Sequence, residues 1–357
     1  MDRDEIYYLI IDLLKKLISI PRESGNEKFA SDELENFAKE YINDKANIYR
    51  IGNNVLIVPI SSSNERPTIL LNSHIDTVKI TNNWITDPYN PIEDSTGKIF
   101  GIGSNDAGAS LVTLLGTFLY FLTNGGSNSY NMVFLASCEE EKSGKGGIEM
   151  VLPHLNNIDF AIVGEPTGMN PAVAEKGLIV IDATVRGVSG HAARDEGENA
   201  IYKALPVISA LRSLRFPEES VWLGPVKLSI TQICAGTQHN VIPDRCNFVI
   251  DVRTTDLYNN ESALEIIRMS VPSYCELNPR SLRLNPSFIS PDNPVVKRLE
   301  ALGRLPFGSP TLSDQALMPW QSLKLGPGDS ARSHTPNEFI YCDEIREALE
   351  IYISILR

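Results

Sequence analysis

L-L-N-S-H-I-D-T-V (residues 70–78) and F-G-I-G-S-N-D-A-G (residues 100–108) are the two motifs that bound the segment deciding the fold. The apolar residues that open the first motif predict a strand. Alternate residues of a strand lie on one face, so we expect His74 beside Asp76. Asp106 follows in a glycine-rich loop before a long apolar helix, where backbone N–H groups and the helix dipole favour an anion. Two candidate metal ligands, His74 and Asp106, therefore flank one strand–helix region.

The composition indicates an ordinary globular protein with an acidic surface. A chain of 357 residues is longer than a single core usually grows, which favours two domains. With 32 Lys+Arg against 45 Asp+Glu, neither nucleic acid nor an anionic membrane is expected as the main partner, and a small molecule is the expected substrate. No apolar run approaches the ~20 residues of a membrane span. Five cysteines without CxxC spacing favour buried thiols in a reducing compartment, so we expect a cytoplasmic protein.

The order of predicted elements indicates two domains, one inserted into the other. Strands alternating with helices up to about residue 174 predict a helix-covered, mostly parallel mixed sheet of the α/β class. The following elements have the order βαββαβ of a ferredoxin-like α+β unit. They are expected at residues 178–185, 200–214, 226–233, 248–252, 264–270 and 281–284. We therefore predict a catalytic domain at 1–174 and 287–357, interrupted by a domain at 175–286.

Two local features complete the prediction for the first domain. Ser24 and Glu27 are spaced like a capping box at the start of an amphipathic helix. A further helix is expected around residues 147–155. The helix after Ser24 and the amphipathic helix expected over residues 6–18 are predicted to be scaffold.

Carboxylates follow two apolar strands at their carboxyl ends. Glu139, Glu140 and Glu141 come directly after the strand at 132–136, and Glu165 follows another apolar strand. A solvated charge cluster is the alternative interpretation of the triple glutamate. Carboxylates crowded at this edge of an α/β sheet repel one another unless a cation compensates, and ligands bind at that edge.

His334 completes a candidate metal-binding set. It lies in S-H-T-P-N-E, after a glycine-rich loop that can present it. Two histidines and three carboxylates suit two zinc-like ions that share one bridging carboxylate, and a further glutamate remains for proton transfer. The set is His74, Asp106, Glu141, Glu165 and His334.

A series of motifs resembles one known enzyme family over nearly the full chain. The motifs are S-H-I-D-T-V, F-G-I-G-S-N-D-A-G, S-C-E-E-E, V-G-E-P-T, G-V-S-G-H-A-A, H-N-V-I-P-D, D-V-R and G-P-G-D-S-A-R-S-H-T-P-N-E. They resemble the metal-dependent amidohydrolases and peptidases that include acetylornithine deacetylase, succinyl-diaminopimelate desuccinylase, aminoacylase and glutamate carboxypeptidase. The short chain length and the residues of the motifs S-C-E-E-E and G-P-G-D-S look closest to the acetylornithine deacetylase branch.

The resemblance implies a centre of two zinc ions, for which cobalt can substitute. His74 and Glu165 would bind one ion, Glu141 and His334 the other, and Asp106 would bridge them.

The resemblance also implies roles for the neighbours of these ligands. Asp76 would orient His74, a supporting role whose loss weakens metal binding. Glu140 would be the general base, because the family places the base immediately before its carboxylate ligand. Glu139 and Glu140 as base and ligand are the alternative. The position of Gly146 favours Glu140 as the base.

The inserted domain would act as a lid and a dimerisation module. His191 in G-V-S-G-H-A-A would reach the scissile carbonyl oxygen, from the lid or from a partner subunit of a homodimer. Asn240 and Arg253 would hold the substrate's carboxylate or carbonyl. For Arg253, a salt bridge with Asp251 or Asp244 is the alternative.

The implied reaction is hydrolysis of the amide bond of an N-acyl amino acid. N-acetyl-ornithine is the expected substrate, with N-succinyl-ornithine and N-acetyl-citrulline as related possibilities, in arginine biosynthesis. A metal-dependent dipeptidase or carboxypeptidase, or a non-catalytic metal-binding protein, is the alternative. A Rossmann-type nucleotide site is disfavoured, because the glycine-rich stretch at 101–106 lacks the third glycine of that fingerprint.

Overall fold

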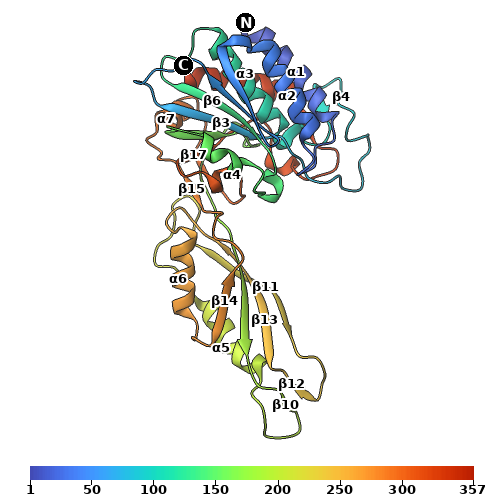
Figure 1. Cartoon of the computed structure of the whole chain (residues 1–357), viewed down its shortest axis with the longest axis vertical. Coiled ribbons are helices and arrows are strands. Elements are labelled where there is room, and N and C mark those ends of the chain that lie inside the picture. Colours follow the sequence, from blue (N-terminus) through green and yellow to red (C-terminus); the bar gives the residue numbers. More distant parts are fainter. The chain divides into compact units, whose positions relative to one another are not determined.

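The structure, a computed structural model, describes residues 1–357 apart from the side chain of Asn43, and it divides into two units (Figure 1). Unit 1 comprises Met1–Val173, Ile289–Phe307 and Ser313–Arg357. Unit 2 comprises Ala174–Phe288 and the short segment Gly308–Leu312. Unit 2 is therefore an insertion in the sequence of unit 1.

A mixed sheet forms the centre of unit 1 (Figure 1). Its central strands β6, β3, β7 and β17 are parallel, and β1, β2 and β8 are antiparallel to their neighbours. This arrangement confirms the predicted α/β class. The strands, in spatial order, are β1 (Ala46–Ile51), β2 (Asn54–Pro59), β6 (Asn131–Ser137), β3 (Thr68–His74), β7 (Phe160–Val163), β17 (Gln321–Lys324) and β8 (Ala172–Glu175). The chain passes into unit 2 within β8, and two short strands at the unit boundaries, β15 (Ser287–Phe288) and β16 (Phe307–Ser309), also pair with β8.

Helices cover both faces of this sheet. Successive strand residues point to opposite faces, so each face offers side chains on which a helix can pack. On one face α3 (Ala109–Thr123) packs on β3 and β6, beside α1 (Arg3–Ile18) and α8 (Cys342–Leu356). On the other face Leu70 and Val133 pack with the short helix α4 (Ile148–Val151). The helices α2 (Lys28–Tyr41) and α7 (Pro294–Ala301) complete the layer beside β1 and α8.

One segment of unit 1 is apolar and long enough to cross a membrane. It runs over Ser104–Thr123 and includes α3, and 78% of its most apolar window is buried in the structure. This length corrects the expectation that no apolar run approaches a membrane span. Its burial is that of a core helix, which follows from its contacts with α1, α8 and the sheet.

Two local predictions are wrong, and a third is right only in part. Ser24 does not cap α2; its hydroxyl donates to the carboxylate of Asp76 at 2.5 Å, while Glu27 accepts from the Gly25 backbone N–H. The helix expected at 147–155 ends early, because Pro153 lacks a backbone N–H and the chain continues as a 3₁₀ turn. The last strand of the second unit lies earlier than expected, at β14 (Cys275–Pro279), where the chain pairs directly with β9.

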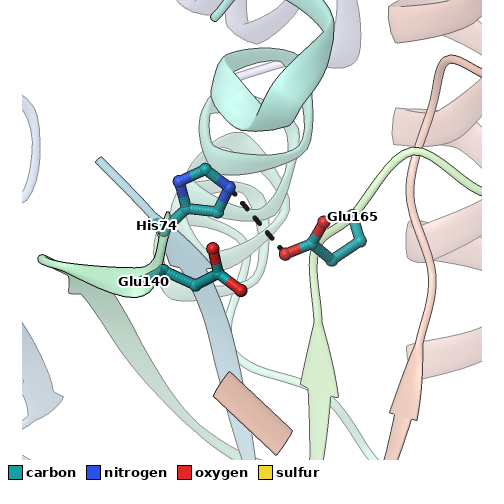
Figure 2. Close-up of side chains that lie close together, drawn as sticks. All are labelled: His74, Glu140 and Glu165. Atoms are coloured by element: carbon teal, nitrogen blue, oxygen red, sulfur yellow. Dashed lines mark ion pairs between the residues drawn. The ribbon is translucent and has the colours of Figure 1, made fainter. Parts of the chain in front are cut away.

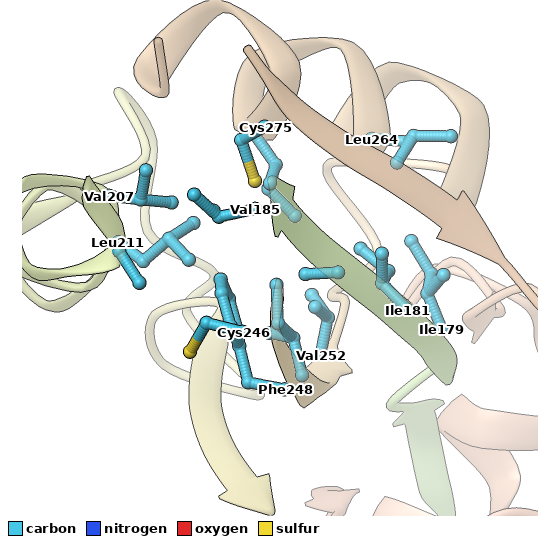
Figure 3. Close-up of a cluster of buried hydrophobic side chains, with 14 of the residues drawn as sticks. Ile179, Ile181, Val185, Val207, Leu211, Cys246, Phe248, Val252, Leu264 and Cys275 are labelled. Atoms are coloured by element: carbon cyan, nitrogen blue, oxygen red, sulfur yellow. The ribbon is translucent and has the colours of Figure 1, made fainter. Parts of the chain in front are cut away.

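Unit 2 has the predicted ferredoxin-like order. Its antiparallel sheet has the strand order β11-β13-β9-β14. Side chains such as Val185, Phe248 and Leu211 form its apolar core between the sheet and two helices (Figure 3). The elements are β9 (Ile179–Arg186), α5 (Ala200–Ser213), β11 (Lys227–Ala235), β13 (Arg245–Arg253), α6 (Asn260–Ser270) and β14, with a short strand pair β10 (Gly190–His191) and β12 (Val241–Ile242).

Candidate metal centre

Three neighbouring parallel strands bring polar side chains to one edge of the sheet. His74 ends β3, opposite Ser137 at the end of β6. Glu140 lies in the 3₁₀ turn that follows β6, and Glu165 follows β7 after one glycine. In Figure 2 the side chains of His74, Glu140 and Glu165 converge on one point. Their convergence follows from the shared direction of the strands.

Asp106 lies between the two predicted histidine ligands. One carboxylate oxygen, Oδ1, is 3.3 Å from Nε2 of His74, and the other, Oδ2, is 3.4 Å from Nε2 of His334. Asp106 comes from an irregular turn over Ser104–Gly108 that leads into α3. One carboxylate therefore faces both of the predicted histidine ligands. This is the position expected of a carboxylate that bridges two cations, one bound by each histidine.

A glutamate accompanies each imidazole. Oε1 of Glu165 is 3.8 Å from Nε2 of His74, and Oε2 of Glu141 is 3.0 Å from Nε2 of His334. The structure thus brings together all five predicted ligands. The donor atoms of His74, Asp106 and Glu141 lie within 4.8 Å of one another. Imidazole nitrogens with carboxylate oxygens are a donor set that fits zinc-like cations.

The backbone sets the orientation of the His74 ring. Its Nδ1 lies 2.9 Å from the backbone carbonyl of Asp76, and a carbonyl can only accept, so Nδ1 carries the proton. Nε2 therefore faces Asp106 and Glu165, and it is the ring nitrogen that would bind a cation once it has lost its proton. Such a hydrogen bond on the far ring nitrogen is the usual support of a metal-binding histidine.

The carboxylate of Asp76 holds a different segment. It accepts from the backbone N–H groups of Glu140 at 3.1 Å and Glu141 at 3.2 Å, and from the hydroxyl of Ser24. Its nearest oxygen is 3.6 Å from Nδ1 of His74. Asp76 therefore contacts both the ring and the turn that carries the glutamates. Sequence reasoning missed Ser24 because its spacing to Glu27 indicated a helix cap.

The carboxylates of the site are buried and crowded. Burial raises the pKa of Glu165 to about 8; the charge of His74 opposes this rise, and Asp106 adds to it. Burial also raises the pKa of Glu140 well above its usual value, against His74 and with Glu165. Burial alone would lower the pKa of His74, but Asp106 and Asp76 raise it well above the ordinary value. A divalent cation bound here would compensate the repulsion between these crowded carboxylates.

Glu139 faces away from this cluster. Its carboxylate accepts from the backbone N–H of Gly146 at 3.0 Å and lies 3.2 Å from Nζ of Lys142. A Cβ atom at Gly144 would lie 2.0 Å from this carboxylate, so a larger residue there would displace the Glu139 side chain. Of the two candidate bases, only Glu140 has its carboxylate among the candidate ligands.

The three residues that are predicted to contact the substrate lie in unit 2. Nδ1 of His191 accepts from the backbone N–H of Ala193 at 3.1 Å, and the Asn240 carbonyl accepts from the N–H of Ala192 at 3.0 Å. His191 and Asn240 thus share the exposed β10–β12 region. Arg253 makes two hydrogen bonds to Asp251, at 2.8 and 3.1 Å, which is the contact considered as its alternative. The roles of all three toward a substrate stay predictions.

Comparison with known proteins places this chain in a family. Residues 70–357 match the model of peptidase family M20/M25/M40. The chain belongs to this family. A succinyl-diaminopimelate desuccinylase of Sulfurovum sp. is 27% identical over 310 residues, which cover 82% of this chain and 80% of that protein. The desuccinylase of Corynebacterium glutamicum is 31% identical over 240 residues, covering 66% and 63%.

Several solved structures share the fold of this chain. The aminopeptidase PepT of Bacillus cereus has a TM-score of 0.75 at 17% identity, over 98% of both chains. The YXEP protein of Bacillus subtilis, described as a dinuclear metal-binding peptidase of the M20 family, also has a TM-score of 0.75 at 17% identity, over 99% of this chain and 98% of that one. The predicted class of metal-dependent amidohydrolase is confirmed. The predicted closeness to acetylornithine deacetylase gains no support, because the Sulfurovum and Corynebacterium relatives are both desuccinylases.

Cation binding should release protons from this site. The hydrogen bond to Glu141, against partial burial and with Asp106, raises the pKa of His334 from 6.5 to about 9. At about pH 7.5 the ring is therefore protonated and must lose its proton before Nε2 can bind a cation. We expect zinc to bind more tightly as pH rises toward 9. Calorimetric titration of the chelator-treated protein, in buffers of different ionisation enthalpy, should show release of about one proton or more.

One histidine variant tests this expectation, and a second histidine variant is its matched control. His334→Gln should lower both zinc affinity and proton release, whereas the exposed His154→Gln should change neither. Tight zinc binding without any proton release would contradict the expected protonation of His334.

Proposed function

We propose that this protein hydrolyses the amide bond of an N-acyl amino acid at a centre of two zinc ions, for which cobalt can substitute. The observation that carries the proposal is the carboxylate of Asp106 between His74 and His334, with Glu165 and Glu141 as the outer ligands. When bound, the two cations would lower the pKa of water and polarise the substrate carbonyl.

Glu140 supplies the proton transfer in this proposal. Its carboxylate lies among the donor atoms, and burial raises its pKa, which favours proton uptake near neutral pH. It takes a proton from the attacking water as the C–O bond forms. It then gives this proton to the amine nitrogen as the C–N bond breaks. The products are a free amino acid and a carboxylate.

Unit 2 supplies the substrate contacts in this proposal. Because Nδ1 of His191 accepts from a backbone N–H, the neutral ring carries its proton on Nε2 and presents a donor for the carbonyl oxygen. Asn240 directly precedes β12, and its carbonyl accepts from the N–H of Ala192, next to His191. Arg253 would share its guanidinium between Asp251 and the substrate carboxylate. Following the family resemblance, we expect unit 2 to form a homodimer.

The identity of the substrate's acyl group and of its amino-acid side chain is a finer part of the proposal. The residues of the sequence motifs favour N-acetyl-ornithine as the substrate, or N-succinyl-ornithine or N-acetyl-citrulline, in arginine biosynthesis. The relatives' name favours a succinylated amino acid. A dipeptidase or carboxypeptidase is the second candidate, because solved relatives of the same fold are described as peptidases. The five cysteines are unpaired, which supports a cytoplasmic location.

Replacing Glu140 should separate catalysis from metal binding. Glu140→Gln should lower turnover by about 100-fold or more, because the water loses its base, while bound zinc stays near the wild-type amount. Glu139→Gln is the matched control and should retain both. Initial rates and metal analysis of the purified variants test this. The reverse outcome, with Glu139→Gln inactive and Glu140→Gln active, would move the base by one residue.

A substrate panel should identify the amide that is cleaved. N-acetyl-ornithine, N-succinyl-ornithine, N-acetyl-citrulline and N-succinyl-diaminopimelate are assayed beside a set of dipeptides. At least one N-acyl amino acid should have a kcat/KM roughly tenfold or more above every dipeptide. A chelator should abolish this activity, and zinc or cobalt should restore it. Preferred turnover of dipeptides would replace the proposal with the peptidase.

A further inference from the structure

Glu338 is a buried carboxylate with no role in the reaction described above. It is 3% exposed and accepts three backbone hydrogen bonds from the loop that carries Asp106. The donors are the N–H groups of Gly103 at 3.0 Å, Asn105 at 2.8 Å and Asp106 at 2.8 Å. Gly103 has a φ of 69°, a left-handed conformation that glycine adopts without strain. The loop is thus folded around a single carboxylate.

The backbone of Glu338 is itself fixed. Its carbonyl accepts from the N–H of Gly101 at 3.0 Å. The next residue begins β18 (Phe339–Tyr341), which pairs with β5 (Lys98–Phe100) on the other side of the loop. His334 lies four residues before Glu338 in the same segment. Glu338 therefore connects the loop of one candidate ligand to the segment of another.

Arg22 provides positive charge for this arrangement. It is 1% exposed, and its Nη2 donates to the carbonyl of Gly103 at 3.0 Å. Burial lowers the pKa of Arg22 to about 10, while the charges of Glu338 and Asp76 act against this loss. These two carboxylates bind the backbone of two different ligand-bearing segments. Arg22 therefore binds, through the carbonyl of Gly103, the same loop that Glu338 binds through its N–H groups.

We propose that Glu338 is a positioning residue that sets the place of Asp106 between the two cations. This inference rests on the proposed function, in which Asp106 is the bridging ligand. A bridging carboxylate must meet two cations at once, so a small displacement of its backbone weakens both contacts. Without the Glu338 carboxylate, three backbone N–H groups in the buried loop would lose their acceptor.

The test is a cobalt titration of the chelator-treated full-length protein, followed by visible absorption and by competition with a chelator. Glu338→Gln keeps the size of the side chain but offers one acceptor oxygen in place of two. We expect about 10- to 100-fold weaker cobalt binding and a changed visible spectrum at saturation, because Asp106 moves relative to the ion. A residue that only stabilised the fold would leave the spectrum of the saturated protein unchanged.

Asp94→Asn is the matched control. Asp94 also accepts backbone N–H groups of a turn, those of Thr96 at 2.8 Å and Lys98 at 3.1 Å, but this turn contains none of the candidate ligands. Cobalt affinity and spectrum should therefore match those of the wild type.

Asp106→Asn distinguishes failure of this inference from failure of the proposed centre. If it weakens cobalt binding while folded Glu338→Gln binds with wild-type affinity and spectrum, the role of Glu338 is overturned. If Asp106→Asn also binds normally, the centre itself is wrong. Should Glu338→Gln not fold, Glu338→Asp is titrated instead, since it keeps the charge but withdraws it by one methylene. Weaker binding is expected for it, and unchanged binding would contradict the inference.

Discussion

The carboxylate of Asp106, shared between the imidazoles of His74 and His334, is the contact around which the candidate site is built. Its two oxygens face candidate ligands from two segments that are far apart in the sequence of unit 1. His74 comes from the central strand β3, whereas His334 comes from the segment after β17. The parallel centre of the sheet is what allows this, because its strands end at one edge and release their following loops there.

Electrostatics explains why so many backbone groups surround this site. Several carboxylates are buried close together, and burial raises the pKa of Glu140 and Glu165. Carboxylates that are not needed as ligands are used to bind backbone N–H groups, as Asp76 does for the glutamate turn. Carboxylates of this site thus have two uses: some are the candidate cation ligands, and others bind the backbone of the loops that carry those ligands. Ligand geometry and loop conformation are therefore expected to depend on each other.

Much of this arrangement could be predicted from sequence, because local patterns encode it. Apolar runs lead into His74, into the glutamate turn that contains Glu141, and into Glu165, and parallel strands then bring these segments together. The ferredoxin-like order of unit 2 was also readable from its alternating strands and helices.

What could not be predicted depends on contacts between distant segments. Ser24 was assigned to a helix cap from its spacing, but the hydroxyl instead reaches Asp76, 52 residues away in the sequence. Glu338 ends a recognised motif, yet its carboxylate binds a loop more than 200 residues earlier, with a separation of 232 from Asp106. No local pattern specifies an acceptor for backbone groups so remote in the chain. These supporting residues become visible only in three dimensions.

The most direct test of the central claim is anomalous diffraction from crystals of the full chain grown with zinc, recorded at the zinc absorption edge. The account predicts two peaks, one beside His74 and Glu165 and the other beside His334 and Glu141, with Asp106 between them. A single peak, or peaks that do not contact Asp106, would contradict it.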